Sequence, residues 1–261
     1  MDNNNKPQNI YEYKTWLREQ HNIEVSDRTK RYYDAVVSKT ADDFRNATLW
    51  KTIISQLEQN NQEYYLNKNY YLFTDTSPPE LYKKPFDSFV LKTFRYNVLN
   101  NAKWPNEPDG GWILPSNWFS RINDMVRTYF VVKYLDGVIF FASKLMDLCD
   151  SLGCNSRVDY EAKEEGYYAA HFYVSFLCDV PREDWDTRDE TISVEIQITT
   201  QLQEVIKRLL HKYYEQRREH LTATDIKWQW DYRSDEFATN YLGHILHYIE
   251  GMIMEVRDKK L

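Results

Sequence analysis

The chain has 261 residues, 42% of them hydrophobic and 28% charged, which is the composition of a soluble globular protein with one large domain or one domain plus an appendage. The net charge of −7 argues against broad nonspecific binding to nucleic acid. The sequence shows no secretory leader and no stretch of eighteen uncharged apolar residues, so we expect a cytoplasmic protein without a membrane span.

The first part of the chain has a helical pattern. Apolar residues recur at three- and four-residue spacing through residues 9–62, with charged residues between them. Ser26 and Asp27 are suited to cap the second helix of this region. The two prolines in residues 74–80 then predict a loop or linker.

The middle of the chain alternates between strand and helix patterns. Residues 86–99 begin with the pattern of a strand and end with that of a helix, and the prolines and glycines of 104–117 predict a long ordered loop or lid. The β-branched and aromatic residues of 128–135 predict a strand. Residues 136–153 have a helical pattern that ends at Gly153.

The remaining part continues this alternation. Residues 156–162 and 170–178 are predicted strands on either side of a glycine turn, and 191–199 alternates strictly between apolar and polar residues. A helical stripe follows from Leu202 onward, and 236–257 is a second amphipathic helix. This order predicts an α/β fold in which helices flank a mixed β-sheet.

Three cysteines, Cys149, Cys154 and Cys178, form no even disulfide framework and have no neighbouring histidine cluster that would complete a zinc site. We therefore expect them to be structural, since a free cysteine behaves as a small hydrophobic residue.

A glycine stands at the start of one predicted strand, although the chain has only seven. Gly166 follows acidic residues and precedes Tyr167. It serves either a turn that needs a positive φ or a turn that presents Tyr167 to a flat ligand. Because the chain has 21 tyrosines, a single exposed ring is weak support for ligand stacking on its own.

Two carboxylates are candidates for phosphoryl chemistry. Glu195 and Gln197 share the polar side of the strand at 191–199, where the pattern alone favours a solvated face. Asp124 lies just before the strand at 128–135, where the alternative is a cap or a turn. If the two carboxylates converge on one face of the sheet, they suit Mg²⁺, which prefers oxygen ligands together with substrate phosphates.

Four segments together resemble the RelA/SpoT family of alarmone synthetases, which includes a subgroup of small toxic members and has a nucleotidyltransferase-like fold. The family has an aspartate in a D-x-x-G stretch before a strand, a K-x-N-G-Y-x-x-x-H stretch that leads into a strand, and a V-E-I-Q-I-R-T stretch that opens a helix. The corresponding stretches here are DMVRTYFVV, KEEGYYAAH and VEIQITT, and a His/Tyr-rich HKYYE follows. The matching residues are Asp124, Lys163, Gly166, Tyr167, His171, Glu195 and Gln197.

This resemblance covers roughly residues 86–258 and implies a pyrophosphokinase domain at 81–261 behind a helical N-terminal extension at 1–80. The implied reaction is transfer of pyrophosphate from ATP to a ribose 3′-hydroxyl with Mg²⁺ as the cofactor. Asp124 would coordinate the metal. Glu195 would assist the metal or act as general base on the hydroxyl.

The resemblance also implies an acceptor site. Tyr167 would stack on the acceptor base, and Gly166 would permit the close turn before it, with Lys163 in the same motif. Gln197 and His171 would hydrogen-bond substrate or hold the strand ends, and for His171 the structural role is the preferred one.

The chain departs from the family at its basic positions. The family's R-x-K stretch with a later Ser and Lys, which binds the ATP phosphates, has no clean counterpart, and Thr199 replaces an arginine. Triphosphate chemistry needs cations. We therefore expect Lys92, Arg95 and Arg127 to supply them in a rearranged donor site; the alternative is that they are surface cations.

The sequence leaves the identity of the pyrophosphate acceptor open. The acceptor is either a guanine or adenine nucleotide or the 3′ end of tRNA. A basic cluster in 207–220 suits an RNA backbone, although a charge run on a helix is more often a solvated face. Its candidate tRNA contacts are Lys207, Arg208, Lys212, Arg217 and Arg218.

Two readings outside catalysis remain. One is a degenerate family member that binds a nucleotide or a partner without transferring pyrophosphate, and the other is an RNA-binding protein. An unopposed synthetase is hazardous to a cell, which suits a stress or defence toxin. The partners considered are an antitoxin or further copies of the same chain.

Overall fold

The computed structural model describes residues 6–181, 187–208 and 227–259. The chain divides into two compact units, each built from three stretches of sequence. Unit 1 contains Met1–Ala47, Leu81–Arg127 and Ser175–Glu195, and unit 2 contains Thr48–Glu80, Thr128–Val174 and Ile196–Leu261. The division into a helical extension at 1–80 and a pyrophosphokinase domain at 81–261 stays a prediction.

The predicted helices of the first 62 residues are present. Helix α1 spans Ile10–His21 and α2 spans Asp27–Asn46 in unit 1, and α3 spans Thr48–Lys68 in unit 2. The Ser26 side chain and Thr29 form a capping box at the start of α2, as the sequence predicts for this position.

The prediction that residues 86–99 begin as a strand is wrong. Helix α4 spans Phe86–Phe94 and continues into a π-helical turn, η2, over Arg95–Leu99. The apolar residues of this stretch also fit a helical period, and they form the buried side of α4: Phe86, Phe89, Val90 and Phe94. Pro85 immediately before the helix lacks the N–H that a strand ladder needs and is well tolerated at a helix start.

A five-stranded mixed sheet has the order β1-β2-β5-β4-β3. The strands are β1 at Tyr82–Lys83, β2 at Val126–Val132, β3 at Asn155–Ala162, β4 at Tyr168–Pro181 and β5 at Thr187–Thr200. Strand β1 pairs antiparallel with β2. The α/β fold predicted from the sequence is confirmed.

Strand β5 is buried on both sides. The aliphatic positions of residues 192–198 are fully buried, and Glu195 and Gln197 are only 3% and 7% exposed. The alternation favours a solvated face for these two side chains, and this prediction is therefore wrong. The physical reason is that β5 lies in the middle of the sheet, between β2 and β4, and a central strand covered on both faces can bury its polar positions too.

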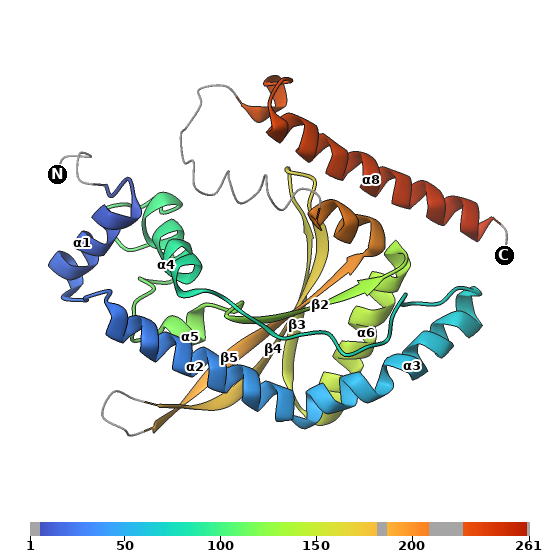
Figure 1. Ribbon diagram of the computed structural model, residues 1–261, viewed down its shortest axis with the longest axis horizontal. Coiled ribbons are helices and arrows are strands. Elements are labelled where there is room, and N and C mark those ends of the chain that lie inside the picture. Colours follow the sequence, from blue (N-terminus) through green and yellow to red (C-terminus); the bar gives the residue numbers. More distant parts are fainter. Residues whose placement is uncertain (1–5, 182–186, 209–226, 260–261) are drawn as a thin grey trace. The chain divides into compact units, whose positions relative to one another are not determined.

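Helix α6, at Leu135–Leu152, packs against α3 and β3 within unit 2 (Figure 1). Gly153 ends α6 in the left-handed conformation with φ 66°, as predicted. The short helix α5 spans Trp118–Arg121 in unit 1, after the predicted loop at 104–117, which contains no helix or strand.

The last long helix, α8, spans Asp235–Asp258 and follows the short 3₁₀ helix η3 at Trp228–Trp230 (Figure 1). Its buried residues are Asn240, Gly243, Glu250 and Arg257. The apolar stripe that the sequence places on this helix is instead exposed over most of its length. Residues 201–208 are also helical, as predicted.

The three cysteines are free, and Cys149 and Cys178 are buried. Burial raises the pKa of each of these two thiols to about 11, so neither is a ready nucleophile at neutral pH. The structural role predicted for them fits this environment. Among the described residues, no helix has both the length and the apolar character that a membrane crossing requires.

Candidate functional site

The first predicted site residue, Asp124, lies between two lysines. It occupies the turn between α5 and β2 in unit 1. Its Oδ2 accepts from Nζ of Lys84 at 2.8 Å, and its Oδ1 accepts from Nζ of Lys92, also at 2.8 Å. The side chain of Asp124 is 14% exposed and that of Lys84 is 13% exposed, so this ion pair is mostly removed from water.

The two lysines set the ionisation of Asp124. Burial disfavours its charged form, but the charges and hydrogen bonds of Lys84 and Lys92 outweigh burial and lower the pKa of Asp124 to about 2. Burial also lowers the pKa of Lys84 from its ordinary value, against the opposing effect of Asp124. Asp124 is therefore a carboxylate at neutral pH, and Lys84 is a cation held in place by that carboxylate.

Lys84 was missed from the sequence. It stands in a Tyr-Lys-Lys stretch at 82–84 that is followed by Ser88 and Lys92. No local sequence pattern marks Lys84, because its contact with Asp124 depends on the fold.

The three cations expected in a donor site have different positions. Lys92, on α4, contacts Asp124 directly and is 45% exposed. Arg127 lies on β2 opposite Tyr82 of β1, and its charge contributes to lowering the pKa of Lys84. Arg95 begins the π-helical turn and is half-buried. The structure thus joins Lys92 and Lys84 to Asp124 and places Arg127 within electrostatic reach of Lys84.

Glu195 lies on β5, which neighbours β2 in the sheet, while Asp124 lies two residues before the start of β2. The Glu195 side chain is buried at 3% exposure. A carboxylate in such a place is costly unless it is neutralised by a partner or used in chemistry. Gln197, two residues along the same strand, is buried as well.

Magnesium at Asp124 stays a prediction, and the residues around it can be compared with what such a site needs. Mg²⁺ in phosphoryl-transfer sites is held by one or two carboxylates, with substrate phosphates and water completing the shell. Among the described residues there is no group of three or more His, Cys, Asp or Glu side chains arranged for a metal, so an all-protein cage is not the arrangement here. Asp124 would supply one carboxylate to such a site, and a metal there would have to share its two oxygens with Lys84 and Lys92.

The second group of predicted residues lies in unit 2, around the turn between β3 and β4. The hydroxyl of Tyr167 is 3.0 Å from Nε2 of His171, and Nζ of Lys163 lies 5.3 Å from the centre of the Tyr167 ring. Glu161 contacts both basic residues, at 2.7 Å from Lys163 and 3.7 Å from His171. The Tyr167 ring is half-buried, whereas His171 is buried at 7% exposure.

His171 and Tyr167 differ in their access to solvent. His171 is buried and contacts the Tyr167 hydroxyl, and its choice between a structural and a substrate-binding role stays a prediction. A half-buried ring with a fixed hydroxyl is suited to stack on a base at its accessible face. Glu161, which no sequence pattern singles out, pairs with Lys163 beside that ring.

Gly166 meets the backbone requirement expected of it. It has φ +76°, and its N–H donates to the carbonyl oxygen of Lys163 at 2.9 Å in a tight turn. A second reason emerges from the structure, because α8 passes so close that a side chain on Gly166 would overlap the carbonyl oxygen of Asn240. The glycine therefore serves both the turn and a close helix contact.

The predicted RNA-contact cluster is only partly described. Nζ of Lys207 lies 3.7 Å from the centre of the Tyr129 ring, and Arg208 pairs with Glu204 at 2.8 Å. Lys212, Arg217 and Arg218 lie outside the described residues. The interaction of these candidates with tRNA stays a prediction.

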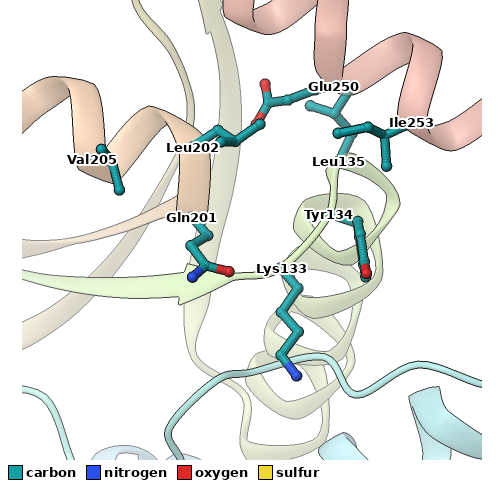
Figure 2. A pocket seen from close by; sticks show the side chains of 8 residues that line it. All are labelled: Lys133, Tyr134, Leu135, Gln201, Leu202, Val205, Glu250 and Ile253. Carbon is teal, nitrogen blue, oxygen red and sulfur yellow. The ribbon is translucent and has the colours of Figure 1, made fainter.

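A pocket of about 320 Å³ lies in unit 2 between α8, the helical residues 201–208 and the start of α6 (Figure 2). Glu250 contributes a carboxylate to its wall, and this carboxylate accepts from Thr200 and from Nε2 of Gln203 at 3.4 Å. None of the residues predicted from the sequence to bind substrate lines this pocket. Its lining is mostly apolar, with Leu135, Leu202, Val205 and Ile253 among the residues shown.

Comparisons with known proteins reveal the fold relationship. Neither a protein-family model nor a curated protein sequence matches the chain. Among solved structures, the small alarmone synthetase 1 from Bacillus subtilis matches with a TM-score of 0.54 at 12% identity, over 90% of this chain and 98% of that one. The same synthetase bound to its product pppGpp matches with a TM-score of 0.57 at 13% identity, over 89% and 98% of the two chains.

At such low identity the likeness concerns the fold. It extends over nearly the whole length of both chains, which excludes a match through one shared motif. The resemblance drawn from the sequence is thereby confirmed for the architecture: this chain has the fold of the small alarmone synthetases.

Proposed function

We propose that this chain is a pyrophosphokinase that transfers pyrophosphate from ATP to the ribose 3′-hydroxyl of a purine nucleotide. The observation that carries the proposal is the Asp124 cluster, in which a carboxylate with a pKa of about 2 is held between Lys84 and Lys92. The synthetase fold and the pppGpp bound to one solved neighbour support the choice of a nucleotide as acceptor.

In the proposed reaction the 3′-oxygen of the acceptor attacks the β-phosphorus of ATP. The bond between that phosphorus and the oxygen bridging to the α-phosphate breaks, and AMP leaves. Glu195 is proposed to accept the proton of the hydroxyl as general base. Mg²⁺, held by Asp124, would supply charge neutralisation on the phosphates.

Lys84 and Lys92 are proposed to bind the phosphates of ATP. Both Nζ atoms lie 2.8 Å from Asp124, so the two charges are already directed at one place before a substrate arrives. Catalysis of this kind consists mostly of positioning and charge neutralisation. Arg127, which is close enough to influence Lys84, adds positive charge to the same region.

Tyr167 is proposed to stack on the acceptor base. Its hydroxyl is engaged with His171 and its ring is half-buried, so the ring is fixed in orientation and retains accessible surface. Stacking on an aromatic ring accepts any purine, and the distinction between guanine and adenine must come from other contacts. The role of a toxin, with an antitoxin as partner, stays an expectation that follows from an active synthetase.

The test is incubation of the purified protein with γ-labelled ATP, Mg²⁺ and separate samples of GDP, GTP, adenine nucleotides and bulk tRNA. Label that moves to a nucleotide, with release of AMP, supports the proposal. Label on tRNA alone would replace the acceptor by the tRNA 3′ end. Binding of ATP without transfer to any acceptor would identify a degenerate nucleotide-binding protein instead.

A further inference from the structure

The pocket between α8, the helical residues 201–208 and the start of α6 takes no part in the proposed reaction (Figure 2). Its volume of about 320 Å³ is at the lower end of the range of small-molecule binding sites. Every residue of its wall belongs to unit 2, so the pocket is a property of one compact unit. It is therefore a candidate for a second binding site, whose lining shares no residue with the predicted nucleotide site.

Most of the wall is apolar. Its aliphatic side chains are Leu135, Leu202, Val205 and Ile253. Val205 is 49% exposed and Ile253 is 39% exposed, so both leave apolar surface in contact with water. A ligand that covers this surface gains free energy because the surface is removed from water. The wall thus favours a ligand with an apolar body.

The wall also contains a buried carboxylate. Glu250 is 3% exposed, and its oxygens accept from the hydroxyl of Thr200 and from Nε2 of Gln203 at 3.4 Å. The one basic side chain in ion-pair contact with it among the described residues is His247, whose Nδ1 lies 3.3 Å from Oε2 and which is positive only when protonated. A carboxylate removed from water without a permanent cation beside it is costly. Glu250 therefore favours a ligand that brings a positive charge.

Lys133, the second charged residue of the wall, does not supply this charge. Its Nζ lies 5.5 Å from the centre of the Tyr71 ring. Figure 2 shows the Lys133 side chain directed away from Glu250. The positive charge of Lys133 is thus held at a different place, and Glu250 keeps its need for a cation.

We infer that this pocket binds an organic cation with an apolar body, such as a primary amine attached to aromatic or branched hydrocarbon. The ammonium group would donate to Glu250 in a charge-assisted hydrogen bond, which is stronger than one between neutral groups. The hydrocarbon would cover Val205 and Ile253. Because the wall combines α8, α6 and residues 201–208, an occupant would stabilise the packing of α8 on the rest of unit 2.

The experiment is titration calorimetry of the full-length protein at pH 8, where an ordinary imidazole is mostly neutral. The probes share one shape and differ in charge: 3,3-diphenylpropylamine is a cation, 3,3-diphenylpropanol is neutral and 3,3-diphenylpropanoate is an anion. We expect the amine to bind with a Kd of roughly 0.1–1 mM, as a fragment of this size does in a pocket. The alcohol and the propanoate should bind at least about 10-fold more weakly.

The variant Glu250→Gln removes the negative charge and keeps the size of the side chain. It should weaken binding of the amine by at least about 10-fold and leave binding of the alcohol within about 3-fold of wild type. Glu255→Gln is the matched control, because Glu255 is a 74% exposed glutamate on the same helix that pairs with Lys259. It should bind all three probes as the wild type does. Far-ultraviolet circular dichroism verifies that each variant is folded.

If Glu250→Gln fails to fold, Leu202→Trp replaces it, since an indole fills the cavity and should abolish binding of the amine and the alcohol alike. No binding of the amine to the wild type at about 2 mM, or equal affinity for the amine and the propanoate, would overturn the inference. So would a folded Glu250→Gln that keeps the preference for the amine, or a folded Leu202→Trp that binds it as tightly as the wild type. None of these measurements involves pyrophosphate transfer, so their failure leaves the proposed function untouched.

Discussion

Gly166 and Gly243 meet backbone to backbone, where the turn between β3 and β4 touches α8. A Cβ on Gly166 would lie 3.1 Å from the Cα of Gly243 and would overlap the carbonyl oxygen of Asn240, and a Cβ on Gly243 would overlap the carbonyl oxygen of Gly166. Two glycines far apart in the sequence thus permit one close contact. Through it, α8 supports the turn that carries Tyr167.

Replacing either glycine by alanine should destabilise the protein. For Gly166→Ala the cost combines a positive φ with the overlap, and we expect a loss of about 3 kcal/mol in the free energy of unfolding. Gly243→Ala should cost a similar amount, although its own backbone is helical and unstrained. Urea denaturation of each variant measures these changes.

Gly251 on the same helix is the matched control. A Cβ at Gly251 meets nothing within 4 Å, so Gly251→Ala should increase the stability by about 0.5–1 kcal/mol through helix propensity alone. Equal effects of the alanine substitutions at 243 and 251 would show that the contact with Gly166 contributes nothing to stability.

Arg257 anchors the C-terminal end of α8. Its side chain is 2% exposed, it donates to Asp136 and Tyr64, and its guanidinium lies 4.8 Å from the centre of the Tyr134 ring. Arg257→Met should lower the free energy of unfolding by about 3 kcal/mol, because it leaves Asp136 without this cation. Lys259→Met, at a 75% exposed lysine two residues away, should change stability by less than about 0.5 kcal/mol. Thermal and urea unfolding of the two variants provide the comparison.

The Asp124 cluster predicts a dependence of stability on pH. The pKa of Asp124 is lowered from 3.8 to about 2 in the folded protein, so its ionised form stabilises the fold above pH 3.8 and this contribution is lost as the pH falls toward 2. The shift corresponds to about 2 kcal/mol. The difference in unfolding free energy between wild type and Asp124→Asn should therefore be larger at pH 6 than near pH 2. A difference that is the same at both values would show that Asp124 is not held by the lysines.

Tyr167 offers a test of the acceptor site through two substitutions. Tyr167→Phe removes the hydroxyl contact with His171 but keeps the ring, and Tyr167→Leu removes the ring. Loss of stacking is worth about 1–3 kcal/mol per base, so Tyr167→Leu should raise the acceptor KM by roughly 5- to 150-fold. The Phe variant should stay within a few-fold of wild type, and the KM for ATP should be unchanged in both. An increase in the ATP KM instead would assign Tyr167 to the donor.

The sequence predicted those elements whose periodicity is unambiguous. The helices of the first 62 residues, α6 with its glycine cap and the strand pattern of β5 all follow from local rules of spacing and capping. The misassigned stretch at 86–99 contains apolar runs that fit either period, and its helix follows from packing of Phe86 and Phe89 in the core of unit 1.

Contacts between residues that are distant in the chain could not be predicted from the sequence. Local alternation on β5 cannot show that Glu195 is buried, because burial depends on the neighbouring strands and on what covers the sheet. In the same way, an amphipathic pattern on α8 does not reveal that its polar side is the packed one, since this requires Asp136 and Thr200 from other elements. Lys84 becomes a site residue only when the fold brings it to Asp124.

The account depends most on Asp124, and its most direct test is the rate of pyrophosphate transfer from γ-labelled ATP to a guanine nucleotide by the wild type and by Asp124→Asn. We predict Mg²⁺-dependent transfer by the wild type, and a decrease in kcat of more than about 100-fold in the variant, since a neutral side chain loses both the metal and the alignment of the lysines. Asp124→Asn that is folded and transfers pyrophosphate at the wild-type rate would contradict the account.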